Sequence, residues 1–244
     1  MNSQQSKNTM SEHGCDICGG LGYIVRRTES GELVSRTCKC EIIRRNRLRM
    51  ERSGLLGLLD SCTFESFQTQ EYWQQAAKQA AERYLTDWKG KWFFIGGSPG
   101  TGKTHRRPPR GGRGLKCLQQ KQVCKKPVVA PLPVRYVQWR GDIPAIKAKV
   151  NDAEAYAEAM HPLKTVRALY IDDFLKGSVT DADKNIAFDL LNARYINPDA
   201  ITIISTELTI DRILSWDEAI GSRINQRAKD YMLNIGKKQN WRLK

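Results

Sequence analysis

The feature that most constrains this chain is a glycine-rich segment that directly follows a short apolar run. The run at residues 91–95 reads KWFFI and is typical of a buried strand, and the segment after it matches the pattern G-x-x-x-x-G-K-[ST]. The glycines of such a loop allow backbone N–H groups to surround the phosphates of a nucleotide. A chance glycine-rich turn is the alternative interpretation. The loop residues are Gly97, Ser98, Pro99, Gly100, Thr101, Gly102, Lys103 and Thr104.

The end of this loop and a second apolar run together predict a site for ATP and Mg²⁺. Lys103 would reach the β- and γ-phosphates, and Thr104 would hold the Mg²⁺ ion. The run at residues 168–171 ends in Asp172 and Asp173, and strand ends gather beside the phosphates in open α/β sheets. We expect Asp172 to bind Mg²⁺, usually through water, and Asp173 to orient or deprotonate the attacking water. The alternative is a strand that ends in a solvated acidic turn.

Four cysteines near the N-terminus form two close pairs, Cys15-x-x-Cys18 and Cys38-x-Cys40. Four thiolates in two pairs can close a tetrahedral Zn²⁺ site, and the glycines between them suit tight turns, so we expect a structural zinc ion here. The second pair has one intervening residue, which is less common than two, and His13 is a possible substitute ligand. The other cysteines have no partner at ligand spacing and are expected to be ordinary thiols: Cys62, Cys117 and Cys124.

Composition narrows the class of protein. No run of 18 apolar residues is present, which excludes a membrane-spanning helix, and the polar N-terminus does not read as a signal peptide. We therefore expect a cytoplasmic protein with reduced thiols. The net charge of +14 suggests a polyanionic partner such as nucleic acid. Residues 105–133 nevertheless hold eight Lys or Arg and no Asp or Glu, so the rest of the chain is only mildly basic.

Apolar runs alternate with helical patterns, which predicts an α/β fold with a central parallel sheet covered on both faces. The chain is expected to divide into a disordered tail (1–12), a zinc-binding module with a basic helix (13–62) and an ATPase domain (63–244). Strands are expected at 91–95, 134–139, 166–171 and 200–205. Helices are expected at 41–59, whose face is rich in arginine, and at 72–85, 143–160, 181–195, 210–220 and 222–229.

The combination of these motifs resembles the DnaC/DnaI group of helicase-loader AAA+ ATPases, above all its phage-encoded members, which are related to IstB transposition helpers. The resemblance is carried by the cysteine pairs, TFESF at 63–67, GGSPGTGKTH at 96–105 and LYIDDF at 169–174, and it covers residues 13–104 and 134–244. It implies an AAA+ P-loop NTPase that uses ATP and Mg²⁺ during DNA replication. The implied partners are a replicative DnaB-type helicase, which the N-terminal module would grip, and single-stranded DNA.

The resemblance also assigns roles to individual residues. Glu207, which follows Thr206, occupies the sensor-1 place, a position that senses the γ-phosphate. Many relatives have Asn there, so the resemblance does not carry the γ-phosphate-sensing role over to Glu207 directly. Arg223 matches the arginine finger, which would reach the ATP of a neighbouring subunit and so implies a homo-oligomer. The alternative is a surface arginine on a helix. Phe64 and Phe67 resemble a motif that packs near the adenine, although two phenylalanines at this spacing also suit a plain core.

The segment after Thr104 conflicts with the helix that a P-loop must open. Pro108 and Pro109, with glycines at 111, 112 and 114, are incompatible with an amphipathic helix. Our hypothesis is that residues from about 106 to about 133 are read in the wrong frame between two compensating indels. The alternative is a genuine basic, proline-rich insertion that binds DNA. In the first case nucleotide binding and folding of the chain as written are impaired.

Two further functions remain open from the sequence. An IstB-like transposition helper would bind duplex DNA and form ATP-dependent filaments. A zinc-containing adaptor without ATPase activity would bind a partner but hydrolyse no ATP.

Overall fold

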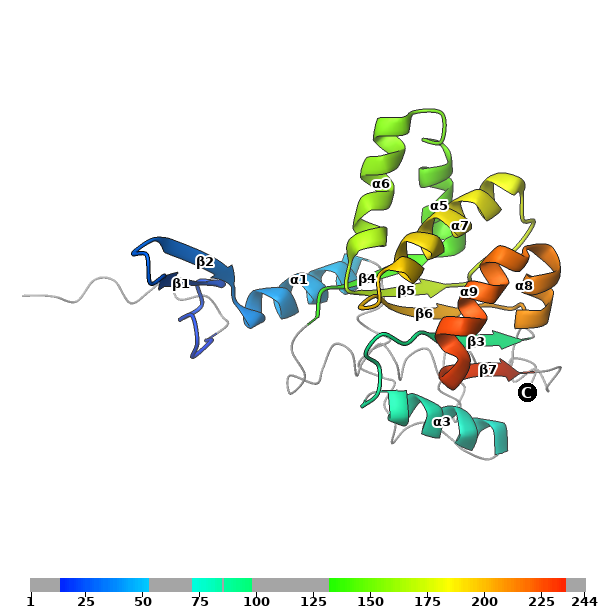
Figure 1. Ribbon diagram of the computed structural model, residues 1–244, viewed down its shortest axis with the longest axis horizontal. Coiled ribbons are helices and arrows are strands. Elements are labelled where there is room, and N and C mark those ends of the chain that lie inside the picture. Colours follow the sequence, from blue (N-terminus) through cyan, green and yellow to red (C-terminus); the bar gives the residue numbers. More distant parts are fainter. Residues whose placement is uncertain (1–13, 53–71, 85, 98–131, 236–244) are drawn as a thin grey trace, which may run out of the picture.

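A computed structural model describes residues 14–52, 72–84, 86–97 and 132–235 of the chain. These residues form a five-stranded sheet with helices on both faces and a separate two-stranded hairpin. Figure 1 shows the hairpin at one end of the long axis, with helix α1 running from it to the sheet. None of the described helices has the length and apolar character needed to cross a membrane.

The sheet has the strand order β4-β5-β6-β3-β7, and every neighbouring pair is parallel. Strands β3, β5 and β6 are buried along their whole length, as their near-continuous apolar sequences predict for a parallel sheet covered on both sides. Because all five strands run the same way, their carboxyl ends meet at one edge. The strands are β3 (Phe93–Gly97), β4 (Val134–Gln138), β5 (Ala168–Asp172), β6 (Ile201–Ser205) and β7 (Met232–Ile235).

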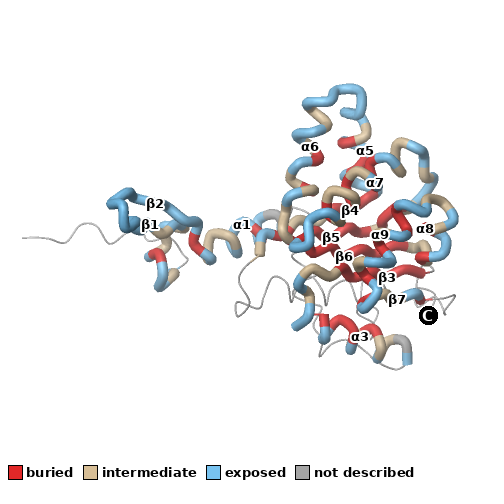
Figure 2. The backbone as a smooth tube through the Cα atoms, in the orientation of Figure 1, coloured by how far each residue is buried: buried red, intermediate tan, exposed pale blue. Residues whose placement is uncertain are grey.

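Alternate residues of the strands face two separate helical layers, so the α/β fold class is confirmed. On one face, Phe94 and Ile171 belong to a core formed with five helices: α5 (Trp139–Lys147), α6 (Ala153–Thr165), α7 (Asp181–Ile196), α8 (Ile210–Trp216) and α9 (Glu218–Ala228). On the other face, Phe93 and Tyr170 pack in a core with α3 (Tyr72–Tyr84). Figure 2 shows the buried sheet between these layers.

Helix α3 illustrates how the sequence pattern produces this packing. Its buried residues Ala77, Ala80, Ala81 and Tyr84 occupy positions i, i+3, i+4 and i+7, so they form one stripe along the helix. The small alanines allow a close approach to the sheet, and the Tyr84 ring meets the Phe93 ring edge-on at 5.2 Å. The Tyr84 hydroxyl donates to the Lys91 carbonyl at 3.0 Å, which satisfies the polar end of the buried ring.

Two of the expected helices were placed wrongly. The pattern at 143–160 is two helices, α5 and α6, because Asp152 ends the intervening turn and its side chain accepts a hydrogen bond from the Ala155 N–H as an N-cap. The pattern at 210–220 breaks at Asp217, which ends α8 and caps α9 by accepting from the Ile220 N–H. A 3₁₀ turn at Lys229–Tyr231 then leads into β7, a short strand that the sequence analysis missed.

A buried arginine joins several of these elements. Arg194 on α7 has no exposed surface, and its guanidinium donates to the Thr202 hydroxyl and to backbone carbonyl oxygens, including those of Val166 at 2.8 Å and Ile201 at 2.6 Å. Burial lowers the pKa of Arg194 to about 10, which leaves the group charged at neutral pH. The arginine thereby ties the end of α6 and the start of β6 to α7.

The N-terminal part is attached to the sheet by α1 (Lys39–Arg52), which follows strands β1 (Tyr23–Arg27) and β2 (Leu33–Thr37). The Asn46 amide lies against the start of β4, where its nitrogen donates to the Leu132 carbonyl at 2.7 Å and its oxygen accepts from the Val134 N–H at 3.0 Å. Asn46 is buried although it is polar, because both of its amide atoms are satisfied.

Candidate functional site

The carboxyl edge of the sheet begins with Gly97, the last residue of β3 and the first of the predicted phosphate-binding loop. Its φ of 136° is a conformation that residues with a side chain rarely adopt, and a Cβ atom there would collide with the Ile235 carbonyl of β7. A glycine is therefore required at this point. Residues 98–104 of the loop, including Lys103 and Thr104, lie outside the described residues.

Asp172 ends β5 at the same edge and is buried, with 4% of its surface exposed. Its carboxylate accepts hydrogen bonds from the Tyr136 hydroxyl at 2.9 Å and from the Ser205 hydroxyl at 2.7 Å. The Asp173 N–H donates to it at 2.7 Å. Burial, followed by the charge of Asp172, raises the pKa of Tyr136, so the phenol remains a donor. Donors from β4 and β6 therefore fix the orientation of this carboxylate.

Asp173 opens a turn whose backbone is unusual. Asp173 and Leu175 both have a φ of 52°, in the left-handed region that disfavours side chains, and this conformation is costly for leucine in particular. The buried Phe174 between them anchors the turn to β6, because its N–H donates to the Ser205 carbonyl at 2.9 Å and its carbonyl accepts from the Thr206 hydroxyl at 2.7 Å. The surrounding contacts hold the strained turn in place.

Lys176 extends this turn toward the end of β6. Its ammonium lies 2.9 Å from a Glu207 carboxylate oxygen and 3.5 Å from an Asp173 carboxylate oxygen. Partial burial alone would lower the pKa of Lys176, but the hydrogen bond that it donates to Glu207 and the charge of Asp173 raise this pKa above its ordinary value. The structure thus brings the predicted Asp173 and Glu207 together around a lysine that the sequence analysis did not identify.

Arg223, the predicted arginine finger, lies on α9 and packs against α7 of its own chain. Its Nε donates to the Asn192 side-chain oxygen at 3.1 Å, and its Nη1 donates to the Ala219 carbonyl at 2.8 Å. The guanidinium carbon is 4.7 Å from the centre of the Phe188 ring and 5.6 Å from that of Tyr195. A role for Arg223 in a neighbouring subunit's site stays a prediction.

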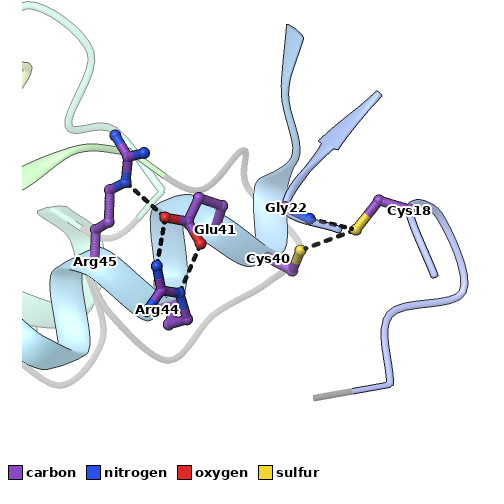
Figure 3. Close-up of polar contacts among 6 residues, drawn as sticks. All are labelled: Cys18, Gly22, Cys40, Glu41, Arg44 and Arg45. Carbon is purple, nitrogen blue, oxygen red and sulfur yellow. Dashed lines mark hydrogen bonds and ion pairs between the residues drawn. The ribbon is translucent and has the colours of Figure 1, made fainter. Parts of the chain in front are cut away.

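The four predicted zinc ligands converge at the base of the hairpin. All four sulfur atoms lie within 4.8 Å of one another, with Cys15 3.8 Å from Cys38 and Cys18 3.4 Å from Cys40. A tetrahedral site with Zn–S bonds of 2.3 Å requires sulfur separations of about 3.8 Å, so the geometry fits zinc. The Gly22 N–H donates to the Cys18 sulfur at 3.3 Å, as Figure 3 shows. These cysteines form no disulfide among themselves.

Sequence reasoning missed the groups that orient the site: Tyr136, Ser205 and Lys176. Tyr136 lies two positions before the end of β4, and Ser205 is the last residue of β6, the two strands on either side of β5. The signal available in the sequence was a polar residue at or near the end of a strand that neighbours β5, because such a residue can reach Asp172. The other sequence predictions fall outside the described residues: His13, Phe64, Phe67, Cys62, Cys117, Cys124 and the segment 106–131.

Comparisons with known proteins can now be set beside this geometry. No protein-family model matches the chain. The chain is 33% identical over 218 residues to the Bacillus subtilis (strain 168) protein YqaM, a match that covers 81% of this chain but only 63% of YqaM. It is 27% identical over 246 residues to the phage-like element PBSX protein XkdC of the same organism, covering 94% of this chain and 85% of XkdC.

Three solved structures show where the fold recurs. The DnaC helicase loader matches with a TM-score of 0.54 and 16% identity over 73% of this chain and 97% of that chain. DnaI matches with a TM-score of 0.53 and 16% identity, and the match covers 76% of this chain and 92% of the DnaI chain. The initiator DnaA bound to AMPPCP and single-stranded DNA matches with a TM-score of 0.53 and 20% identity. This match covers 74% of this chain and 51% of the DnaA chain, so the likeness spans about half of DnaA. The chain therefore shares the fold of these two helicase loaders and of about half of DnaA.

Proposed function

We propose that this chain is an ATP-dependent loader that places a replicative DnaB-type helicase on single-stranded DNA during replication. The observation that carries the proposal is the meeting of Gly97, Asp172, Asp173 and Glu207 at the carboxyl edge of a sheet with the fold of DnaC and DnaI. Open parallel sheets bind nucleotides at this edge.

The roles of the site residues follow from the chemistry of phosphoryl transfer. Residues 97–104 would surround the phosphates, with Lys103 on the β- and γ-phosphates. Thr104 directly and Asp172 through water would hold Mg²⁺, which neutralises phosphate charge when bound. The two hydroxyl donors on Asp172 keep its carboxylate in one orientation for this task. Asp173 would orient the attacking water and accept its proton.

The partner-binding roles are proposed for the N-terminal residues 13–62. Zn²⁺ held by the four cysteines would fix the hairpin at the start of α1 and present its side chains to the helicase. Large apolar residues on this part are exposed, which suits a protein partner: Ile17, Leu21, Tyr23, Val25, Leu33 and Val34. The ATPase domain would be residues 63–244, acting in the cytoplasm as an oligomer joined through Arg223.

An assay of ATP hydrolysis beside a helicase pull-down tests the proposal. With a genuine insertion at 106–133, the chain as written is expected to hydrolyse ATP, to lose this activity in the Lys103→Ala variant, and to retain a replicative helicase on single-stranded DNA only with ATP. Binding to duplex DNA with ATP-dependent filaments, and no helicase in the pull-down, would instead indicate an IstB-like helper.

The segment at about 106–133 favours one other outcome, an ATPase-inactive zinc adaptor. The same assays on a frame-corrected chain separate a damaged ATPase from an inactive adaptor, because only the former regains hydrolysis when the reading frame is restored. Sequencing the coding DNA provides an independent check. If neither alternative frame encodes an amphipathic helix followed by a loop, the frameshift hypothesis is wrong.

A further inference from the structure

The ion-pair cluster formed by Lys176, Asp173 and Glu207 has a charge arrangement that the proposed mechanism does not use. Lys176 Nζ lies 2.9 Å from Glu207 and 3.5 Å from Asp173, and all three side chains are only 20% to 26% exposed. Partly buried ion pairs are screened less by salt than exposed ones, so this cluster can influence a charged ligand at the sheet edge.

Glu207 occupies a place where a negative charge is unfavourable for ATP binding. It follows β6, and β6 lies between β3, which ends at Gly97, and β5, which ends at Asp172. In the proposed ATPase, a triphosphate held at Gly97 and Asp172 would have its γ-phosphate near the end of β6, the strand between them. Without compensation, the Glu207 and Asp173 carboxylates would repel each other and the phosphate, because like charges a few ångströms apart interact strongly at a partly buried site.

The turn that carries Lys176 is built to hold its ammonium at this point. The Lys176 N–H donates to the Asp173 carbonyl at 3.0 Å, and Leu175, whose φ of 52° is strained, is 97% buried. Phe174 is bonded to β6 through both its N–H and its carbonyl. The backbone of Lys176 is thus fixed relative to the strand that precedes Glu207, and only its side chain needs to be ordered.

We propose that Lys176 is a positioning residue that neutralises Glu207 and holds Asp173, so that a glutamate is tolerated beside the terminal phosphate of ATP. The inference rests on the proposed ATPase function. It assigns two separable effects to one ammonium group. Neutralising Glu207 affects the binding of ATP but not of ADP, which lacks the γ-phosphate, and holding Asp173 affects the hydrolysis rate.

The test compares four variants with the wild-type chain: Lys176→Met, Lys176→Arg, Lys176→Met/Glu207→Gln and Lys184→Met. The last is a matched control, because Lys184 pairs with Asp181 at 3.4 Å with the same three-residue spacing, away from this cluster. We measure the dissociation constants of ADP and of ATPγS with Mg²⁺, and the kcat and KM for ATP.

Lys176→Met is expected to weaken ATPγS binding several-fold without changing ADP binding, and to lower kcat by about tenfold or more, since a misplaced catalytic group is costly. The double variant should regain the affinity for ATPγS but not the wild-type kcat. Lys176→Arg should retain most of the ATPγS affinity and most of the kcat, and Lys184→Met should match the wild-type chain in both. If Lys176→Met behaves like the wild-type chain, or loses affinity for ADP and ATPγS equally, the inference about Lys176 is wrong while the proposed function still stands. Failure of both the chain as written and the frame-corrected chain to bind either nucleotide would overturn the proposed function and this inference with it.

Discussion

At the scale of single residues, the site depends on hydroxyl groups that fix a buried carboxylate. We predict that Ser205→Ala lowers the free energy of unfolding by about 1–3 kcal/mol, because it removes a hydrogen bond to the charged Asp172 while that carboxylate stays buried. Urea denaturation measures the change. Ser215→Ala is the matched control, since the Ser215 hydroxyl donates to the Arg212 carbonyl at an exposed position. Equal stability of the two variants would contradict the prediction.

Glu41 on α1 provides a pH-dependent prediction at the same scale. Hydrogen bonds from Arg44 and then Arg45 lower the pKa of Glu41 from 4.5 to about 2, and Figure 3 shows both arginines around its carboxylate. Because the folded pKa lies below the unfolded one, the stabilisation is present above about pH 4.5 and is lost as the pH falls toward 2.

A carboxyl ¹³C NMR titration checks this assignment directly. The Glu41 resonance should titrate near pH 2 in the wild-type chain and closer to 4.5 in Arg44→Gln/Arg45→Gln. Acid also protonates cysteines and releases a bound metal, so the two chains are compared at each pH rather than against neutral pH. A Glu41 pKa that is the same in both chains would show that the arginines do not hold the carboxylate in solution.

At the scale of elements, Arg194 is the group on which several helices and strands depend. We predict that Arg194→Met lowers the free energy of unfolding by about 1–3 kcal/mol, because the carbonyl oxygens that it satisfies would be left buried without that donor. Arg212→Met, which removes an arginine stacked on the Trp216 ring, should have an effect within about 0.5 kcal/mol. Denaturant unfolding of both variants provides the comparison.

Elements also show what the sequence could predict. Strands β3, β5 and β6 were located to within two residues because buried parallel strands are continuous apolar runs. The helix breaks at Asp152 and Asp217 were missed because a single capping carboxylate leaves the apolar periodicity on either side intact. The Lys176 cluster could not be inferred because it depends on a left-handed turn that brings residue 176 to the end of a different strand.

At the scale of the whole molecule, we expect the structure of the N-terminal part to depend on zinc bound at the cysteine cluster. We predict one zinc ion per chain by atomic emission, and its loss in Cys38→Ser, since Cys38 is fully buried among the other sulfur atoms. Chelation should unfold the hairpin and the start of α1, seen as faster amide exchange there, while the sheet stays protected. Cys62→Ser, at a predicted ordinary thiol, is the control and should retain zinc.

The position of α1 has a mechanical consequence for the molecule. Cys40 and Asn46 lie on this one helix, about 9 Å apart along its axis, so a continuous helical segment joins the sulfur cluster to the start of β4. The Val134 N–H donates a hydrogen bond to Asn46, and two residues further along β4 the Tyr136 hydroxyl donates to the Asp172 carboxylate. The sulfur cluster is therefore connected to the Asp172 carboxylate, the group proposed to hold the metal, through one helix and one strand.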